Sequence, residues 1–304
     1  MAISAAIVKE LRERTGAGMM DCKKALVETN GDMEAAIDYL REKGLSKAAK
    51  KSSRVAAEGI VAIGYSEDGK QGAIIEVNSE TDFVAKNEEF VTMVDAFVQV
   101  VLANDFADVE ELLAAPMGDG TVKDELAAKI AKIGENMTIR RFAKFAAEGS
   151  VSAGYIHGGG KIGVLVEFAT ETADVDTIKT MGRDVAMQVA SMNPQFVDES
   201  GVDTEYLEHE KKILMQQALG EGKPAAIAEK MVIGRLKKEL KETCLVEQPF
   251  VKDGDISVGQ YVEKIAKAVG TDVKVKSFVR YVVGEGIEKQ VDDLAAEVAK
   301  MTAQ

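Results

Sequence analysis

The feature of this sequence that most constrains its fold is an internal repeat in the middle of the chain. The pattern E-G-x-V-x-x-G-Y occurs at residues 58–65 and again at residues 148–155. A glycine followed by an apolar run with one glutamate occurs at 72–77 and again at 163–168. Each copy is typical of a β-hairpin, and apolar residues at helical spacing follow it. The period is far longer than that of a solenoid, so the pattern predicts a duplicated subdomain.

The repeat predicts an α+β fold with two related core subdomains, each combining a small antiparallel sheet with helices on one face. Two segments do not fit the duplication. Residues 105–145 contain acidic helical sequence and a strand predicted from Met137 to Phe142. Residues 203–243 show two apolar stripes at helical spacing and no strand pattern, which predicts an inserted helical hairpin. An antiparallel coiled coil is the natural form of such an arm.

Helical spacing also organises both ends of the chain. It predicts three short helices in residues 1–44, with Gly44 ending the third. A basic stretch from Lys47 to Arg54 follows, which we interpret as a solvated tether in slight preference to a docking site for an acidic partner. Near the other end, Gly284 and Gly286 precede a final amphipathic helix, which could dock on its own body or on a partner. The predicted domains are 1–54 (helical module and basic linker), 55–145 (core N-subdomain), 146–283 (core C-subdomain with the arm 203–243) and 284–304 (C-terminal helical module).

Charge and composition exclude several functional classes. The chain carries 38 basic and 51 acidic residues, a net charge of −13, which argues against direct nucleic-acid binding. No apolar run reaches the roughly 20 residues that cross a bilayer, so no membrane association is expected. The N-terminus has no features of a targeting segment, and Cys22 and Cys244 are expected to be free thiols in a reducing cytoplasm. With only His157 and His209, a multi-histidine metal site is nearly excluded.

One glycine-rich stretch has the composition of a catalytic motif but lacks its essential residues. Gly158-Gly159-Gly160-Lys161 would need a glycine at Tyr155 and a hydroxyl residue at Ile162 to be a phosphate-binding loop. His157 with the three glycines resembles an esterase oxyanion segment, but the chain contains no G-x-S-x-G. We therefore predict a tight hairpin turn with His157 exposed beside it. We predict no cofactor and no enzymatic activity.

The segment from Thr81 to Asn87 connects the predicted strand at 73–77 to a helix predicted to begin near Glu88. Taken alone, it is typical of a helix start at which Thr81 or Asp82 caps the helix and Phe83 packs beneath it. Strand-to-helix connections also carry function, because a rigid scaffold aims their side chains.

This segment and four others resemble the elongation factor Ts family, which exchanges nucleotide on elongation factor Tu. Several separated motifs in the same order strongly indicate this family, although residues 159–161 depart from the sequence that its members more commonly carry. The resemblance implies a small ubiquitin-associated-like helical module, a two-part core, an inserted coiled-coil arm and a terminal module. The motifs are Arg14–Leu26, Thr81–Asn87, Lys132–Asn136, Tyr155–Gly158 and Gly284–Lys289.

The resemblance also implies a mechanism and a partner, elongation factor Tu in its GDP-bound and nucleotide-free forms. Thr81, Asp82, Phe83 and Val84 would form the segment that displaces magnesium from the partner. Phe83 would wedge between two helices of the GTPase domain, and Asp82 would contact the same region. The remaining docking residues implied by the resemblance are Met19, Met20, Ile133, Gly134, His157, Leu294 and Val298.

Two alternatives come from other classes of protein. The three-helix module could belong to an adaptor that binds ubiquitin-like or other partners without exchange activity. An enzyme using carboxylate chemistry ranks below both, because no pair of carboxylates stands out. The sequence leaves open whether the chain forms a homodimer or a 2:2 complex through the C-subdomain or the coiled-coil arm.

Overall fold

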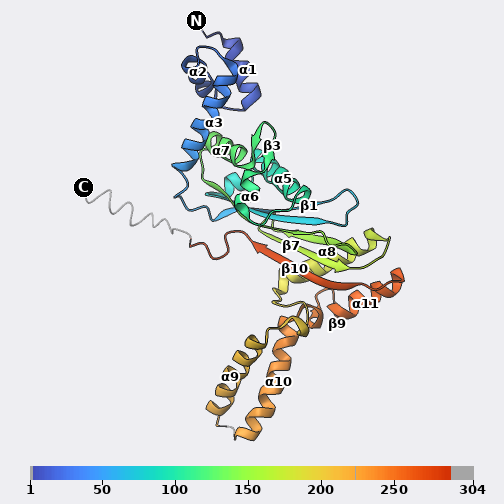
Figure 1. The fold of residues 1–304 in the computed structure, drawn as a ribbon. Helices are drawn as coiled ribbons and strands as arrows, with labels where there is room; N and C mark the ends of the chain where they lie inside the picture. The colour runs from blue at the N-terminus through green and yellow to red at the C-terminus, as the bar shows by residue number, and fades with distance from the viewer. Residues whose placement is uncertain (1–2, 223, 289–304) are drawn as a thin grey trace, which may run out of the picture. The chain divides into compact units, whose positions relative to one another are not determined.

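A computed structural model describes residues 3–222 and 224–288 (Figure 1). The chain forms two compact units. Among the described residues, unit 1 comprises the chain up to Ala62, Ile75–Phe142 and the chain from Val282, and unit 2 comprises Ile63–Ile74 and Ala143–Tyr281. Helices combine with antiparallel strands, which confirms the predicted α+β class. The domain boundaries drawn from the sequence remain a prediction.

The N-terminal module consists of three helices, as predicted. They are α1 (Ala5–Thr15), α2 (Met19–Glu28) and α3 (Met33–Ala49). Ser4 and Asp32 cap α1 and α3 by accepting hydrogen bonds from backbone amides of the first turn. One side of each helix contributes to a small apolar core made of Val8, Leu11, Cys22, Ala25, Leu26 and Ala36.

Two predictions about the end of this module were wrong. Gly44 does not end the third helix, because α3 continues to Ala49 and packs on α7 (Val122–Ile133). Gly44 is buried against the backbone of Ala127, and this packing offsets the cost of about 1 kcal/mol for a glycine inside a helix. The basic stretch is not a solvated tether either, because three of its four basic side chains bind within unit 1. Lys47 pairs with Asp21 at 3.0 Å, Lys51 donates to the Gly134 carbonyl at 2.6 Å, and Arg54 lies 3.4 Å from Glu80.

The first sheet has the strand order β1-β2-β5, formed by β1 (Glu58–Tyr65), β2 (Gly72–Ser79) and β5 (Met137–Phe145). Between β2 and β5 the chain forms α4 (Asp82–Ala85), α5 (Glu88–Ala103), α6 (Val109–Ala114), the two-residue strands β3 (Pro116–Met117) and β4 (Gly120–Thr121), and α7. The predicted apolar stripe of α5 is buried, and its buried residues are Phe90, Met93, Val94, Phe97, Val98, Val101 and Leu102.

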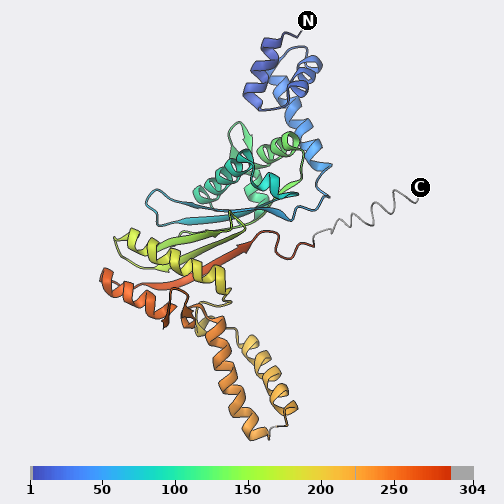
Figure 2. The same cartoon turned by 180° about the vertical axis from the view of Figure 1, so that it is seen from behind.

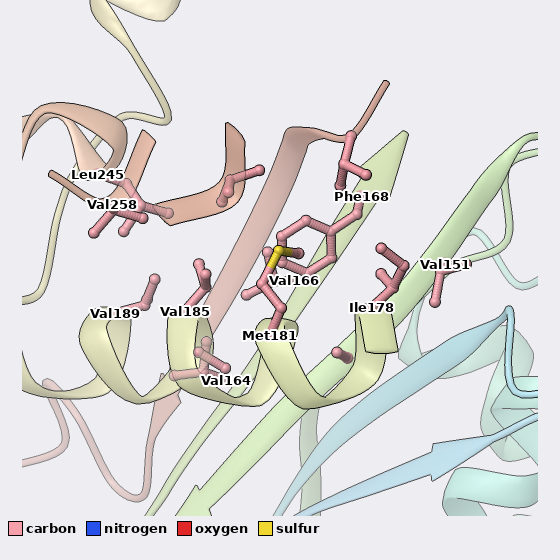
Figure 3. Packing of buried hydrophobic residues seen from close by; sticks show 14 of the residues in the cluster. Val151, Val164, Val166, Phe168, Ile178, Met181, Val185, Val189, Leu245 and Val258 are labelled. Carbon is pink, nitrogen blue, oxygen red and sulfur yellow. The ribbon is translucent and has the colours of Figure 1, made fainter. Parts of the chain in front are cut away.

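The second sheet, in unit 2, has the order β10-β7-β6. β6 (Ser150–His157) and β7 (Ile162–Ala169) form the predicted antiparallel hairpin, in which Ser150 pairs with Ala169 and His157 with Ile162. α8 (Val175–Met192) lies along β6 and β7 (Figure 2). A Cβ added at Gly182 would lie 2.4 Å from that of Ala153, so glycine permits this close approach. Figure 3 shows the core between helix and sheet, with Val151, Val164, Val166, Phe168, Ile178, Met181, Val185, Val189, Leu245 and Val258 labelled.

The duplication extends further than the repeat in the sequence. We predicted that residues 105–145 do not fit the duplication, and this was wrong for residues 137–145. These residues form β5, which pairs with β2 in the way that β10 (Lys274–Val282) pairs with β7. Each half therefore has a hairpin, a helix that follows it and a third strand beside the second. Sequence similarity between the third strands is too weak to show this, since strand pairing needs only a compatible apolar face.

The predicted arm is a pair of helices, α9 (Thr204–Gly220) and α10 (Ala225–Thr243), which contact each other (Figure 1). Its coiled-coil form stays a prediction. The chain between the arm and β10 contains α11 (Val258–Val269), which the sequence analysis missed. Its start carries a capping box between Ser257 and Gln260, so the local signal was present. The short hairpin β8 (Pro249–Phe250) and β9 (Asp253–Ser257) precedes it.

Candidate functional site

The segment after β2 forms a single helical turn that leaves one aromatic ring in solvent. Thr81 caps α4, and its hydroxyl oxygen accepts a hydrogen bond from the Val84 amide at 3.4 Å. Val84 and Ala85 are buried, whereas Phe83 is 82% exposed. The capping predicted for Thr81 is therefore confirmed, and the alternative in which Phe83 packs beneath the helix is wrong.

Charged and polar side chains complete the turn on its outer side. The Lys86 ammonium lies 2.6 Å from the Asp82 carboxylate in an exposed pair one turn apart. Asn87 then caps α5 by accepting from the Glu89 amide at 2.8 Å, so the next helix begins at Glu88, as predicted. Two caps in close succession thus define where each helix of this connection starts.

A second motif of the sequence analysis lies directly against this segment. Glu135, in the turn between α7 and β5, accepts two hydrogen bonds from Thr81: one from its amide at 3.0 Å and one from its hydroxyl at 2.7 Å. In return, the Glu80 carboxylate accepts a hydrogen bond from the Asn136 amide. We call this reciprocal arrangement of Glu80, Thr81, Glu135 and Asn136 the clasp.

Contacts from the same turn extend around the clasp. Gly134 ends α7 with φ +92°, a conformation that favours glycine, and its carbonyl accepts from Lys51. Lys132 donates to both carboxylate oxygens of Glu89 at 2.8 and 2.7 Å. This hydrogen bond lowers the pKa of Glu89 below its ordinary value. The structure thus brings Ile133 and Gly134 into the surroundings of residues 81–84.

The two methionines proposed for docking are on the surface of the N-terminal module. Met19 is 56% exposed and Met20 is 73% exposed, both in the first turn of α2. Val27 on the same helix is 57% exposed. Methionine side chains are flexible and polarisable, so Met19 and Met20 present an adaptable apolar surface.

His157 belongs to unit 2, where it ends strand β6 and is exposed. Its Nδ1 lies 3.0 Å from the Tyr155 hydroxyl, and its carbonyl accepts from the Lys161 amide at 3.1 Å. Gly158, Gly159 and Gly160 all have positive φ, which makes the tight turn that the glycines predicted. Leu294 and Val298 lie outside the described residues.

The clasp could not be predicted from the sequence. Residues 132–136 and 81–87 are separate motifs there, and no local spacing connects positions so far apart in the chain. A glutamate at position 80 and another at 135 were the available signals. Within residues 3–222 and 224–288, no cluster of three or more potential ligands could hold a metal ion. Over the same ranges, no helix has both the length and the apolar character needed to cross a membrane.

The fold and this site define an α+β protein whose rigid core aims an exposed aromatic ring from a strand-to-helix connection, the arrangement of a protein that acts by contacting another protein. The family model for elongation factor TS matches residues 80–285. Elongation factor Ts of Clostridioides difficile (strain 630) is 59% identical over 299 residues, covering 98% of each chain. Elongation factor Ts of Clostridium perfringens (strain 13 / Type A) is 55% identical over 300 residues, covering 98% of this chain and 99% of the relative. The chain belongs to the elongation factor Ts family, and is thus a translation elongation factor.

Proposed function

We propose that this protein binds elongation factor Tu carrying GDP and promotes release of the GDP, so that GTP can bind. Residues 81–84 perform the central step, in which Phe83 wedges into the GTPase domain and its magnesium ion is displaced. The observation that supports this proposal is the 82% exposure of Phe83 on a turn whose neighbours are buried or hydrogen-bonded. An aromatic ring held out in solvent is available for burial in a partner without rearrangement of its own chain.

The chemistry of nucleotide binding explains why a wedge is sufficient. Magnesium and the amides of a phosphate-binding loop together neutralise the diphosphate, so losing the metal weakens binding sharply. The coupling is reciprocal, because any factor by which this protein lowers nucleotide affinity is the factor by which nucleotide lowers its own affinity. Each tenfold of that factor corresponds to about 1.4 kcal/mol. No bond is made or broken, so the protein is an exchange factor without enzymatic chemistry or a cofactor of its own.

The other surfaces supply docking in this proposal. Asp82 contacts the region that Phe83 enters, and the exposed methionines and the tip of the β6–β7 hairpin hold the partner elsewhere. The protein acts in the cytoplasm, where translation takes place. Light scattering of the chain alone and with its partner will distinguish a 1:1 complex from a homodimer or a 2:2 complex. The docking residues proposed are Met19, Met20, Ile133, Gly134, His157, Leu294 and Val298.

The test is release of fluorescently labelled GDP from elongation factor Tu, with the double variant Asp82→Ala, Phe83→Ala. Burying a phenylalanine contributes about 1.5–3 kcal/mol, so the variant should slow release by about ten- to a hundredfold while still docking. Val251→Ala is the control, because it removes another exposed apolar side chain (46% exposed) that the proposal does not use. An unchanged release rate in the double variant would remove the mechanism.

A chelator separates displacement of the metal from other ways of loosening the nucleotide. With magnesium removed by EDTA, the wild-type protein should lose most of its advantage over the double variant, because the step that Phe83 performs is already complete. An advantage that survives chelation in full would show that magnesium is not the target. A wild-type chain that binds elongation factor Tu without accelerating release would favour the adaptor alternative instead.

A further inference from the structure

We propose that Glu135 is a positioning residue for exchange: its carboxylate holds residues 81–84 in the conformation that presents Phe83, and Glu80 locks the same contact from the other side. This inference rests on the proposed function of the segment. It adds two residues that neither the sequence motifs nor the family match assigns to the step.

The first argument is the way in which Glu135 determines the cap of α4. An ionised carboxylate only accepts hydrogen bonds, so the Thr81 hydroxyl must point its hydrogen at Glu135, over 2.7 Å. A lone pair of the same oxygen is then left to accept from the Val84 amide, at 3.4 Å. The Thr81 amide donates to the second oxygen of Glu135, at 3.0 Å. Glu135 thereby fixes both the backbone and the side chain of the capping residue.

The second argument is that the contact is reciprocal. Glu80 accepts from the Asn136 amide and lies 3.4 Å from the Arg54 guanidinium. The Asn136 side chain donates to the Arg54 carbonyl at 2.7 Å, which closes a ring of contacts inside unit 1. Because each connection supplies the acceptor for an amide of the other, the segment cannot turn without breaking bonds at two places.

The third argument is that few other contacts determine the direction of Phe83; outside the clasp, the buried Ser79 hydroxyl donates to the Thr81 carbonyl at 2.9 Å. The ring is 82% exposed, so packing does not hold it, and α4 is a turn of four residues that would be marginal in isolation. Burial of Val84 and Ala85 anchors one side of the turn. The clasp fixes its start, and together the two anchors set where the aromatic ring points.

Two substitutions break the clasp from opposite sides, and a third leaves its hydroxyl contact in place. Glu135→Ala removes both acceptor oxygens, and Thr81→Val removes the hydroxyl while keeping the shape of the side chain. Thr81→Ser keeps the hydroxyl and should keep its hydrogen bond to Glu135. Glu125→Gln is the matched control, because it removes an α7 carboxylate that has only a loose pair with Lys129 at 3.6 Å.

The readout is the rate of GDP release from elongation factor Tu as a function of the concentration of each variant. A hydrogen bond to a charged group contributes about 1.5 kcal/mol or more, so Glu135→Ala and Thr81→Val should each lower the maximal rate about tenfold. The half-saturating concentration should change little, because docking uses other surfaces. The double variant should be no slower than either single variant, Thr81→Ser should be faster than Thr81→Val, and Glu125→Gln should match the wild type.

These outcomes separate this inference from the proposed function. If Asp82→Ala with Phe83→Ala slows release but Glu135→Ala does not, the function holds and the positioning role is refuted. A rise in the half-saturating concentration alone, with an unchanged maximal rate, would also refute the positioning role.

A measurement on the free chain tests the clasp without any partner. The Thr81 amide should exchange its hydrogen about ten times faster in Glu135→Ala than in the wild type, while amides of α5 keep their protection. Equal exchange at Thr81 in the two proteins would overturn the inference whatever the release assay shows.

Discussion

Glu76→Gln probes a fully buried carboxylate at the centre of unit 1. Glu76 lies on β2 with no exposed surface, and its two oxygens accept hydrogen bonds from four donors. Two of these donors are guanidinium groups from neighbouring positions of β5, and one is a backbone amide just after β10. The partners are Arg140 at 3.1 Å, Arg141 at 2.6 Å, the Gly284 amide at 2.9 Å and the Asn78 side chain at 3.1 Å.

The expected loss in the free energy of unfolding of Glu76→Gln follows from the contacts that the two arginines lose. Glutamine keeps the shape of Glu76, but it carries no charge and turns an N–H group toward donors. Removing one member of a buried ion pair costs about 3–5 kcal/mol. The lower end, about 3 kcal/mol, applies here, because Arg140 and Arg141 retain bonds to Glu285 and to the Val282 carbonyl.

The repeat provides a matched control at the equivalent position, Glu167 on β7. This carboxylate is also buried, at 4% exposure, but its partners are the hydroxyls of Ser150 and Ser277, each at 3.1 Å, and Lys276 at 3.5 Å. Hydroxyl groups can rotate to accept from an amide, and Lys276 is 47% exposed. Glu167→Gln should therefore cost only about 1 kcal/mol.

Hydrogen exchange measured by mass spectrometry is the suitable assay, because a chain with two compact units need not unfold in one step. Opening of β2 and β5 should become about a hundredfold more frequent in Glu76→Gln, and opening of β7 and β10 about fivefold in Glu167→Gln. If the two variants lose the same protection, the arginine pairs do not stabilise the strand, and the reasoning from partners is refuted.

Two further predictions concern backbone conformation and pH. Gly284→Ala should destabilise unit 1 by about 2 kcal/mol or more, since φ is +69° and the new Cβ would clash with the Ala57 carbonyl oxygen. The control Gly286→Ala has φ +75° and open space around the new Cβ, so it should destabilise by only about 1 kcal/mol. Denaturant titration of both variants measures the difference. Burial, and then repulsion from Glu210, raise the pKa of Glu239 in the arm. A carboxyl whose pKa is raised on folding stabilises the fold at acid pH, and this is lost as pH rises through the folded value. Glu239→Gln should therefore increase the protection of α9 and α10 at neutral pH and flatten its pH dependence in hydrogen exchange.

The candidate site shows how far local patterns reach. Apolar spacing and capping residues located the start of α5 at Glu88 and the cap at Thr81, because both depend on neighbours within one helical turn. The exposure of Phe83 was not decided by spacing, since the same local sequence also fits a ring packed beneath the helix. Contacts between Thr81 and Glu135 join residues distant in the chain, and no periodicity reports them.

Local order in the sequence was enough to predict the duplicated hairpins, the three N-terminal helices and the tight turn after His157, whereas the predicted C-terminal helix lies outside the described residues. The folded chain was needed to show that β5 completes the first sheet, that α3 continues through Gly44 and that two glutamates clasp the turn carrying Phe83. The physical reason is that helical and strand periodicity depend on residues a few positions apart. Sheet pairing, helix packing and buried hydrogen bonds depend on which distant surfaces meet when the chain folds.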